Sequence, residues 1–97
     1  MNNLELQRLE RMARLLPPRS LNLAKTNTMF GPLYLAWGEH AGSWYGVWAI
    51  RGIAQTVEFR SGVDESVVRH VLVHCAMTFA ADMSDARLYQ QPGRFDA

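Results

Sequence analysis

The sequence predicts a small α+β domain in which two helices pack on one face of a three-stranded antiparallel meander. Three observations predict this class. Apolar residues recur at helical spacing near both ends of the chain, three short segments between them alternate as strands do, and tight-turn residues separate those segments. At 97 residues, with 48% hydrophobic and 20% charged residues, the chain has the size and composition of one globular domain. We therefore expect a single domain over 1–97 in the order α-β-β-β-α.

The first helix is expected over about 3–16. Its apolar stripe consists of Leu6, Leu9, Met12 or Ala13, and Leu16. Asn2 followed by Glu5 is typical of a helix N-terminus, and Pro17 would end the helix. Residues 17–31 show no period, so we expect a connection along the domain edge, with a short helical turn in it. Its apolar residues are expected to point inward: Leu21, Leu23, Met29 and Phe30.

The strands are expected at about 33–37, 44–50 and 53–60. Side chains alternate along 33–37 and 53–60, and 44–50 is rich in aromatic and β-branched residues. The turn-forming stretch "GEHAGS" separates the first two strands, and Arg51-Gly52 is short enough to join the second and third as a tight hairpin. This connectivity predicts a meander.

The second helix is expected over about 64–83, opening at Asp64 or Ser61. Its predicted core face consists of Val67, Val68, Val71, Leu72, Cys75, Phe79 and Met83. Beyond it we expect a short extended piece from Arg87 to Gln90 and a loose tail over 91–97.

Packing both helices on one face would leave the other face of the sheet open. Residues 32–50 contain Trp37, Trp44 and Trp48 together with two tyrosines. Alternation places Trp44 and Trp48 on the same side of their strand, but a register shift of one residue would exchange the core and open sides. Both registers stay open at this point. We expect at least one tryptophan to be exposed or in an interface.

Catalytic chemistry is not indicated. The chain contains no G-x-S-x-G, no glycine-rich phosphate loop and no dinucleotide-binding fingerprint, so we expect neither an enzyme nor a cofactor. Cys75 lies on the apolar side of its helix, where a thiol usually only packs. His70 and His74 have a spacing that can chelate a metal, but a zinc site needs three or four ligands, and we expect none here.

The expected location is the cytoplasm, because no N-terminal signal peptide and no apolar run of about 20 residues is found, and one cysteine cannot form an internal disulfide. The net charge of +1 does not favour a general polyanion binder.

These observations favour a non-catalytic protein-binding module. The expected partner-binding residues are the sheet aromatics, two arginines near the strand ends and a helix flank poor in charge, namely Tyr34, Trp37, Trp44, Trp48, Arg51, Arg60, Val73 and Met77. Size and the lack of catalytic motifs are typical of small accessory proteins of phages and mobile elements, including anti-CRISPR inhibitors of host defence. We therefore expect a protein partner, such as a multi-subunit host complex. A homodimer through the same surfaces is a structural variant of this hypothesis.

Nucleic-acid binding is the alternative. It would use Arg8, Arg11 and Arg14 on the polar face of the first helix, together with base stacking on the aromatics. The element order is also that of double-stranded-RNA-binding domains, which carry lysines at the start of the second helix. In this chain that helix opens with Asp64 and Glu65, which repel phosphates. This alternative is therefore the weaker one.

Overall fold

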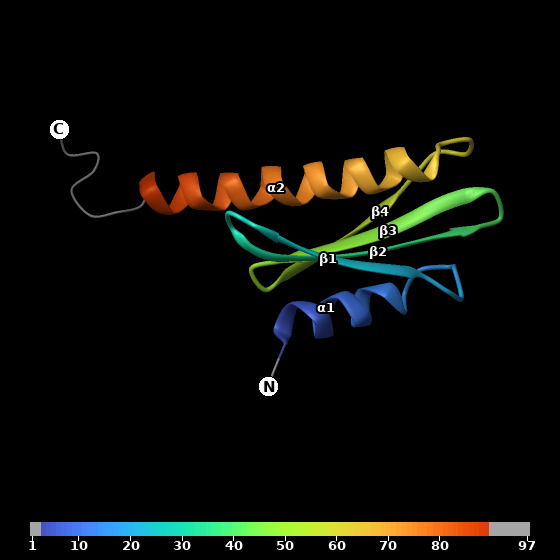
Figure 1. Cartoon of the computed structure of the whole chain (residues 1–97), viewed down its shortest axis with the longest axis horizontal. Coiled ribbons are helices and arrows are strands. Elements are labelled where there is room, and N and C mark those ends of the chain that lie inside the picture. Colours follow the sequence, from blue (N-terminus) through green and yellow to red (C-terminus); the bar gives the residue numbers. More distant parts are fainter. Residues whose placement is uncertain (1–2, 90–97) are drawn as a thin grey trace.

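The computed structural model describes residues 3–89, which form a four-stranded antiparallel sheet between two helices (Figure 1). The elements are, in chain order, α1 (Leu4–Ala13), β1 (Asn22–Thr28), β2 (Gly31–His40), β3 (Ser43–Ile50), β4 (Ile53–Glu58) and α2 (Glu65–Tyr89). The strands pair in sequence order, β1-β2-β3-β4. The expected α+β class and the antiparallel meander are therefore confirmed. The tail predicted over 91–97 lies outside the described residues.

The two helices lie on opposite faces of the sheet, as Figure 1 shows. The α2 side is built on Leu33, Leu35, Trp37, Trp48 and Ile50, and the α1 side on Tyr34, Ala36, Val47 and Ala49. The prediction that both helices pack on one face is therefore wrong. The stretches "LYLAW" and "GVWAI" are apolar at successive positions, which is typical of strands buried on both faces.

β1 is a strand that the sequence pattern did not predict. It pairs with β2 over its whole length, from Asn22 opposite Trp37 to Thr28 opposite Gly31. Every β1 residue except Thr28 is exposed, so the strand lacks the apolar alternation by which strands are recognised. The inward position expected for Leu23 is also wrong, because this side chain is 64% exposed.

The two predicted hairpins are present and have two-residue turns. Ala41 and Gly42 join β2 to β3 with φ angles of 52° and 82°, and Arg51 and Gly52 join β3 to β4 with 53° and 80°. Two consecutive residues in the left-handed region are the signature of a type I′ turn, whose twist matches that of the flanking strands.

α1 begins one residue later than predicted. Asn3, rather than Asn2, caps the helix, because the Asn3 side chain accepts a hydrogen bond from the Leu6 amide at 3.0 Å. The Asn3 amide nitrogen also donates to the hydroxyl of Tyr34 on β2, which fixes the start of α1 against the sheet. The helix ends at Ala13, ahead of the two prolines.

α2 approaches the sheet through small residues. Its buried stripe is Val68, Leu72, Ala76 and Ala80, whereas Val67, expected in the core, is 46% exposed. The missing side chain of Gly46 on β3 makes room for Leu72, since a Cβ on Gly46 would lie 2.7 Å from a Leu72 methyl carbon. The helix continues to Tyr89, so the extended piece predicted from Arg87 is wrong, and its far end projects past the sheet (Figure 1). Within residues 3–89, neither helix combines the length and the apolarity that a membrane span requires.

Candidate functional site

Two grooves flank α2, because this helix lies over the central strands β2 and β3 and not over the edges of the sheet. The groove beside β1, here called the β1 groove, has a volume of about 490 Å³. It is lined by Ala24, Thr26, Leu35, Trp37, Ser66, Arg69, His70 and Val73. The groove beside β4, here called the β4 groove, has a volume of about 360 Å³. It is lined by Trp48, Gln55, Val57, His74, Cys75, Thr78, Phe79 and Asp82.

Trp37 forms part of the β1 groove and is held there by polar contacts. Its indole Nε1 donates a hydrogen bond to Oε2 of Glu65, in the first turn of α2, at 2.7 Å. The same oxygen accepts from the side-chain nitrogen of Asn22 on β1 at 3.5 Å. The guanidinium carbon of Arg69 lies 5.8 Å from the centre of the indole ring, a cation–π distance. One carboxylate thus links β1, β2 and α2 at this end of the groove.

The α2 wall of the β1 groove overlaps in part with the helix flank that the sequence marked as poor in charge, and it also includes Arg69. Val73 is half-buried and lines the groove, and His70 lines it from an exposed position. Met77 is half-buried one turn further along the same flank. The structure therefore brings together two of the expected partner-binding residues, Trp37 and Val73, in one groove.

β1 presents different side chains on its two faces. Ala24 and Thr26 lie on the α2 side, where they line the groove. Leu23 and Lys25 lie on the α1 side, since successive side chains of a strand alternate between faces. The Lys25 ammonium lies 5.7 Å from the centre of the Tyr34 ring, directly across the strand pair.

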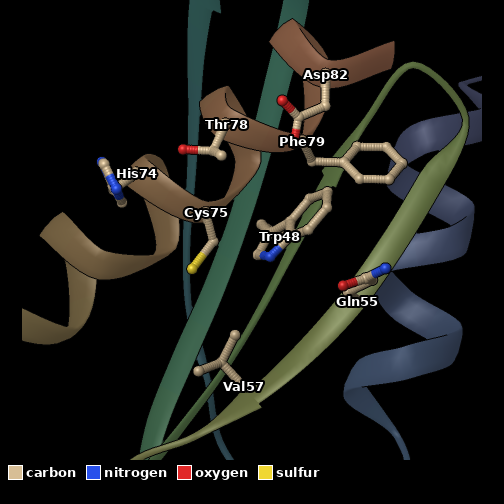
Figure 2. Close-up of a pocket in the computed structure, with 8 residues that line it drawn as sticks. All are labelled: Trp48, Gln55, Val57, His74, Cys75, Thr78, Phe79 and Asp82. Atoms are coloured by element: carbon tan, nitrogen blue, oxygen red, sulfur yellow. The ribbon is translucent and has the colours of Figure 1, made fainter. Parts of the chain in front are cut away.

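The β4 groove is floored by core aromatics (Figure 2). Trp48 is only 2% exposed, and its ring centre lies 5.3 Å from that of Phe79 at a tilt of 48°. Figure 2 shows the Cys75 thiol beside this pair and His74 turned away from it. Because α2 covers Trp48, the open aromatic face that the sequence predicted does not exist.

The remaining expected partner-binding residues are dispersed. Tyr34 is buried under α1, and Trp44 is half-buried at the margin of the α2-side core. Arg51 lies in the β3–β4 turn, where its guanidinium is 3.5 Å from the hydroxyl oxygen of Ser84, and Arg60 is exposed beyond β4. None of the three tryptophans, all within the described residues, is exposed, so the expected exposure is not met. The expectation that one of them lies in an interface stays a prediction.

The arginines proposed for nucleic-acid binding lie on the opposite side of the sheet from the tryptophans. Arg8, Arg11 and Arg14 are all exposed on or directly after α1. Trp37 and Trp48 belong to the α2-side core. A nucleic-acid interface that combines this basic strip with stacking on these rings would need both on one surface, and the fold separates them.

The two histidines of α2 line different grooves. His70 lines the β1 groove and His74 lines the β4 groove, although they are one turn apart on α2. Over the part of the chain that the structure describes, no three His, Cys, Asp or Glu side chains come together as metal ligands could. The structure thus offers no third ligand to either histidine within this range.

Six of the eight residues that line the β1 groove were not among the expected partner-binding residues, namely Ala24, Thr26, Leu35, Ser66, Arg69 and His70. Glu65, which accepts the hydrogen bond of Trp37, was not among them either. The alternating threonines at 26 and 28 were the available signal for β1, but no apolar face accompanied them. Comparison with known protein families, characterised proteins and solved structures gave no match.

Proposed function

We propose that the chain is a non-catalytic protein-binding module that receives an extended segment of another protein along the free edge of β1. One observation carries the proposal. β1 is a strand of seven residues that is paired on one side only, and neither core cluster of the described residues includes a residue from it. The backbone N–H and C=O groups on the free side of an edge strand can pair with a further strand.

Of the usual means of protecting an edge, β1 has only a central lysine. Its sequence, "NLAKTNT", has no proline, and its register with β2 runs without a bulge from Asn22 to Thr28. α1 packs on β2, β3 and β4, and α2 packs on β2 and β3, so β1 is left uncovered. Its one charged side chain, Lys25, lies over the Tyr34 ring. Proteins normally blunt such an edge, so its accessibility favours a binding role.

The β1 groove supplies the specificity that backbone pairing lacks. Side chains of an added strand that lie on the α2 side would stand next to Ala24 and Thr26. From there they reach the groove formed by Trp37 and Val73. In strand addition, main-chain hydrogen bonds supply affinity, and pockets for alternate side chains supply specificity.

This proposal keeps the partner class expected from the sequence and moves the contact surface from an open aromatic face to β1 and its groove. A small accessory protein of a phage or mobile element that inhibits a multi-subunit host complex, as anti-CRISPR proteins do, would need such a surface and no reaction chemistry. That setting is supported by the lack of catalytic motifs in the sequence.

The proposal is tested by affinity capture from the native host with two matched variants. Thr26→Arg places a long charged side chain in the β1 groove, and Thr56→Arg makes the same change at an exposed position of β4. A partner captured by the wild type and by Thr56→Arg, and lost with Thr26→Arg, is expected. Capture that survives Thr26→Arg, or the absence of any specific partner, contradicts the proposal. Circular dichroism confirms that each variant is folded.

A further inference from the structure

Lys25 gives the free edge of β1 a defined chemical character. It is the one charged residue of this strand, it lies at the middle of the seven residues, and it is exposed. The β1–β2 register places it opposite Tyr34, and its ammonium lies over that ring at 5.7 Å. A positive charge is therefore held on the α1 side of the edge.

The neighbours of Lys25 meet a different environment. Ala24 and Thr26 lie on the α2 side and line the β1 groove, together with the apolar side chains of Leu35 and Val73. Side chains of an added strand alternate in the same way. The residue opposite Lys25 would face a cation. The residues before and after it would face the β1 groove, where Leu35, Trp37 and Val73 supply apolar surface beside the polar side chains of the α2 wall.

We infer that the partner segment carries an acidic side chain opposite Lys25, with an apolar side chain on each side of it. Opposite charges directly across a strand pair are stabilising and like charges are destabilising. Apolar side chains on the other face bury surface against the groove. This inference rests on the proposed function, since it specifies what β1 binds.

The same lysine disfavours a second copy of the chain as the occupant. Two β1 strands that pair antiparallel over their whole length are related by an axis at the central residue, which is Lys25. The two ammonium groups would then lie directly opposite each other. Sliding one β1 strand along the other would separate the two lysines. The smallest slide that keeps every side chain on its own face of the sheet is two residues, and it leaves residues at the ends of both strands unpaired. A segment with a carboxylate at this position has neither cost.

The test is a parallel selection of random peptides of strand length, displayed on phage, against the wild type and against Lys25→Glu. Both selections use the full chain and are depleted on Thr26→Arg. The wild type is expected to enrich peptides with an acidic residue between two apolar ones, and Lys25→Glu is expected to enrich a basic residue at the same place. The best wild-type peptide should bind Lys25→Glu about tenfold more weakly, since reversal turns a cross-strand attraction into a repulsion.

The outcomes separate this inference from the proposed function. If neither selection enriches any peptide over the Thr26→Arg depletion, strand addition at β1 fails, and the inference fails with it. If peptides are enriched without an acidic residue, or if Lys25→Glu leaves their affinity unchanged, the inference alone is overturned. Sedimentation equilibrium tests whether a second copy of the chain occupies β1. A wild-type dimer that Thr26→Arg converts to a monomer would identify a second copy as the occupant and would also overturn the inference.

Discussion

β1 and β4 are the two edge strands of one sheet, yet only β4 contributes to the core. Ile53 and Val57 of β4 pack against the α2-side core, and Ala54 packs against the α1-side core. α1 also lies against β4. β1 has the same backbone pairing to its neighbour, but its side chains are almost all exposed, and Leu23 is 64% exposed.

This difference in side-chain burial indicates that the two edge strands have different roles. β4 is held by side-chain burial on both of its faces, so its residues serve the stability of the domain. β1 is held mainly by backbone pairing, together with the contacts of Asn22 with Glu65 and of Lys25 with Tyr34. Its free edge and most of its side chains are therefore available to a partner. Substitutions on the β4 side of the sheet should therefore lower the free energy of unfolding, and substitutions on β1 should chiefly affect binding.

The first prediction tests whether Trp48, on β3 next to β4, belongs to the hydrophobic core. Trp48→Ala should lower the free energy of unfolding by about 3–5 kcal/mol, because it removes a buried ring that packs on Phe79. Urea denaturation measures this change. Trp44→Ala is the matched control on the same strand, and it should cost clearly less, because Trp44 is only half-buried. Equal losses for the two variants would contradict the assignment of Trp48 to the core.

The second prediction compares the two edges directly. Ile53→Ala on β4 should cost about 1–2 kcal/mol, less than the full value for a buried isoleucine because this side chain is half-buried. Leu23→Ala on β1 should stay within about 0.5 kcal/mol of the wild type. Thermal or urea unfolding of both variants gives the comparison. A loss at Leu23 as large as that at Ile53 would show that β1 also serves the core.

The third prediction concerns the link between α2 and the β1 groove. Glu65→Ala removes the acceptor of the Trp37 Nε1 hydrogen bond and should cost about 1 kcal/mol, since Glu65 itself is exposed. Glu65→Gln keeps an oxygen acceptor and should cost less. Urea denaturation of the pair distinguishes the hydrogen bond from other effects of the site. If both variants are as stable as the wild type, the link does not stabilise the groove.

Much of the fold could be predicted from the sequence because burial leaves a pattern. The aromatic and β-branched residues of 44–50, the alternation along 53–60 and the Arg51-Gly52 turn identify β3, β4 and the hairpin between them. The wrong placement of the helices has a physical reason. "LYLAW" has apolar residues at odd and even positions, which indicates a strand buried on both faces, whereas the prediction assumed burial on one face only.

The candidate site was harder to predict because β1 buries almost nothing. A strand exposed on both faces has no apolar alternation, so "NLAKTNT" resembles a loop. Trp37 was expected to bind a partner because it belongs to the aromatic strands, and Val73 because it lies on a helix flank poor in charge. Only the fold shows that both line one groove beside β1. Tyr34 and Trp48 were expected at the same surface and are buried instead, under α1 and α2 respectively.

Backbone amide hydrogen exchange on the free chain and on its complex with the captured host partner tests whether β1 is the binding edge. In the free chain, amides of β1 should exchange faster than those of the central strands. In the complex, exchange should slow selectively over Asn22–Thr28, while β4 stays as it was in the free chain. Slower exchange at β4 or α1 with β1 unchanged would contradict the proposal that β1 is the binding edge.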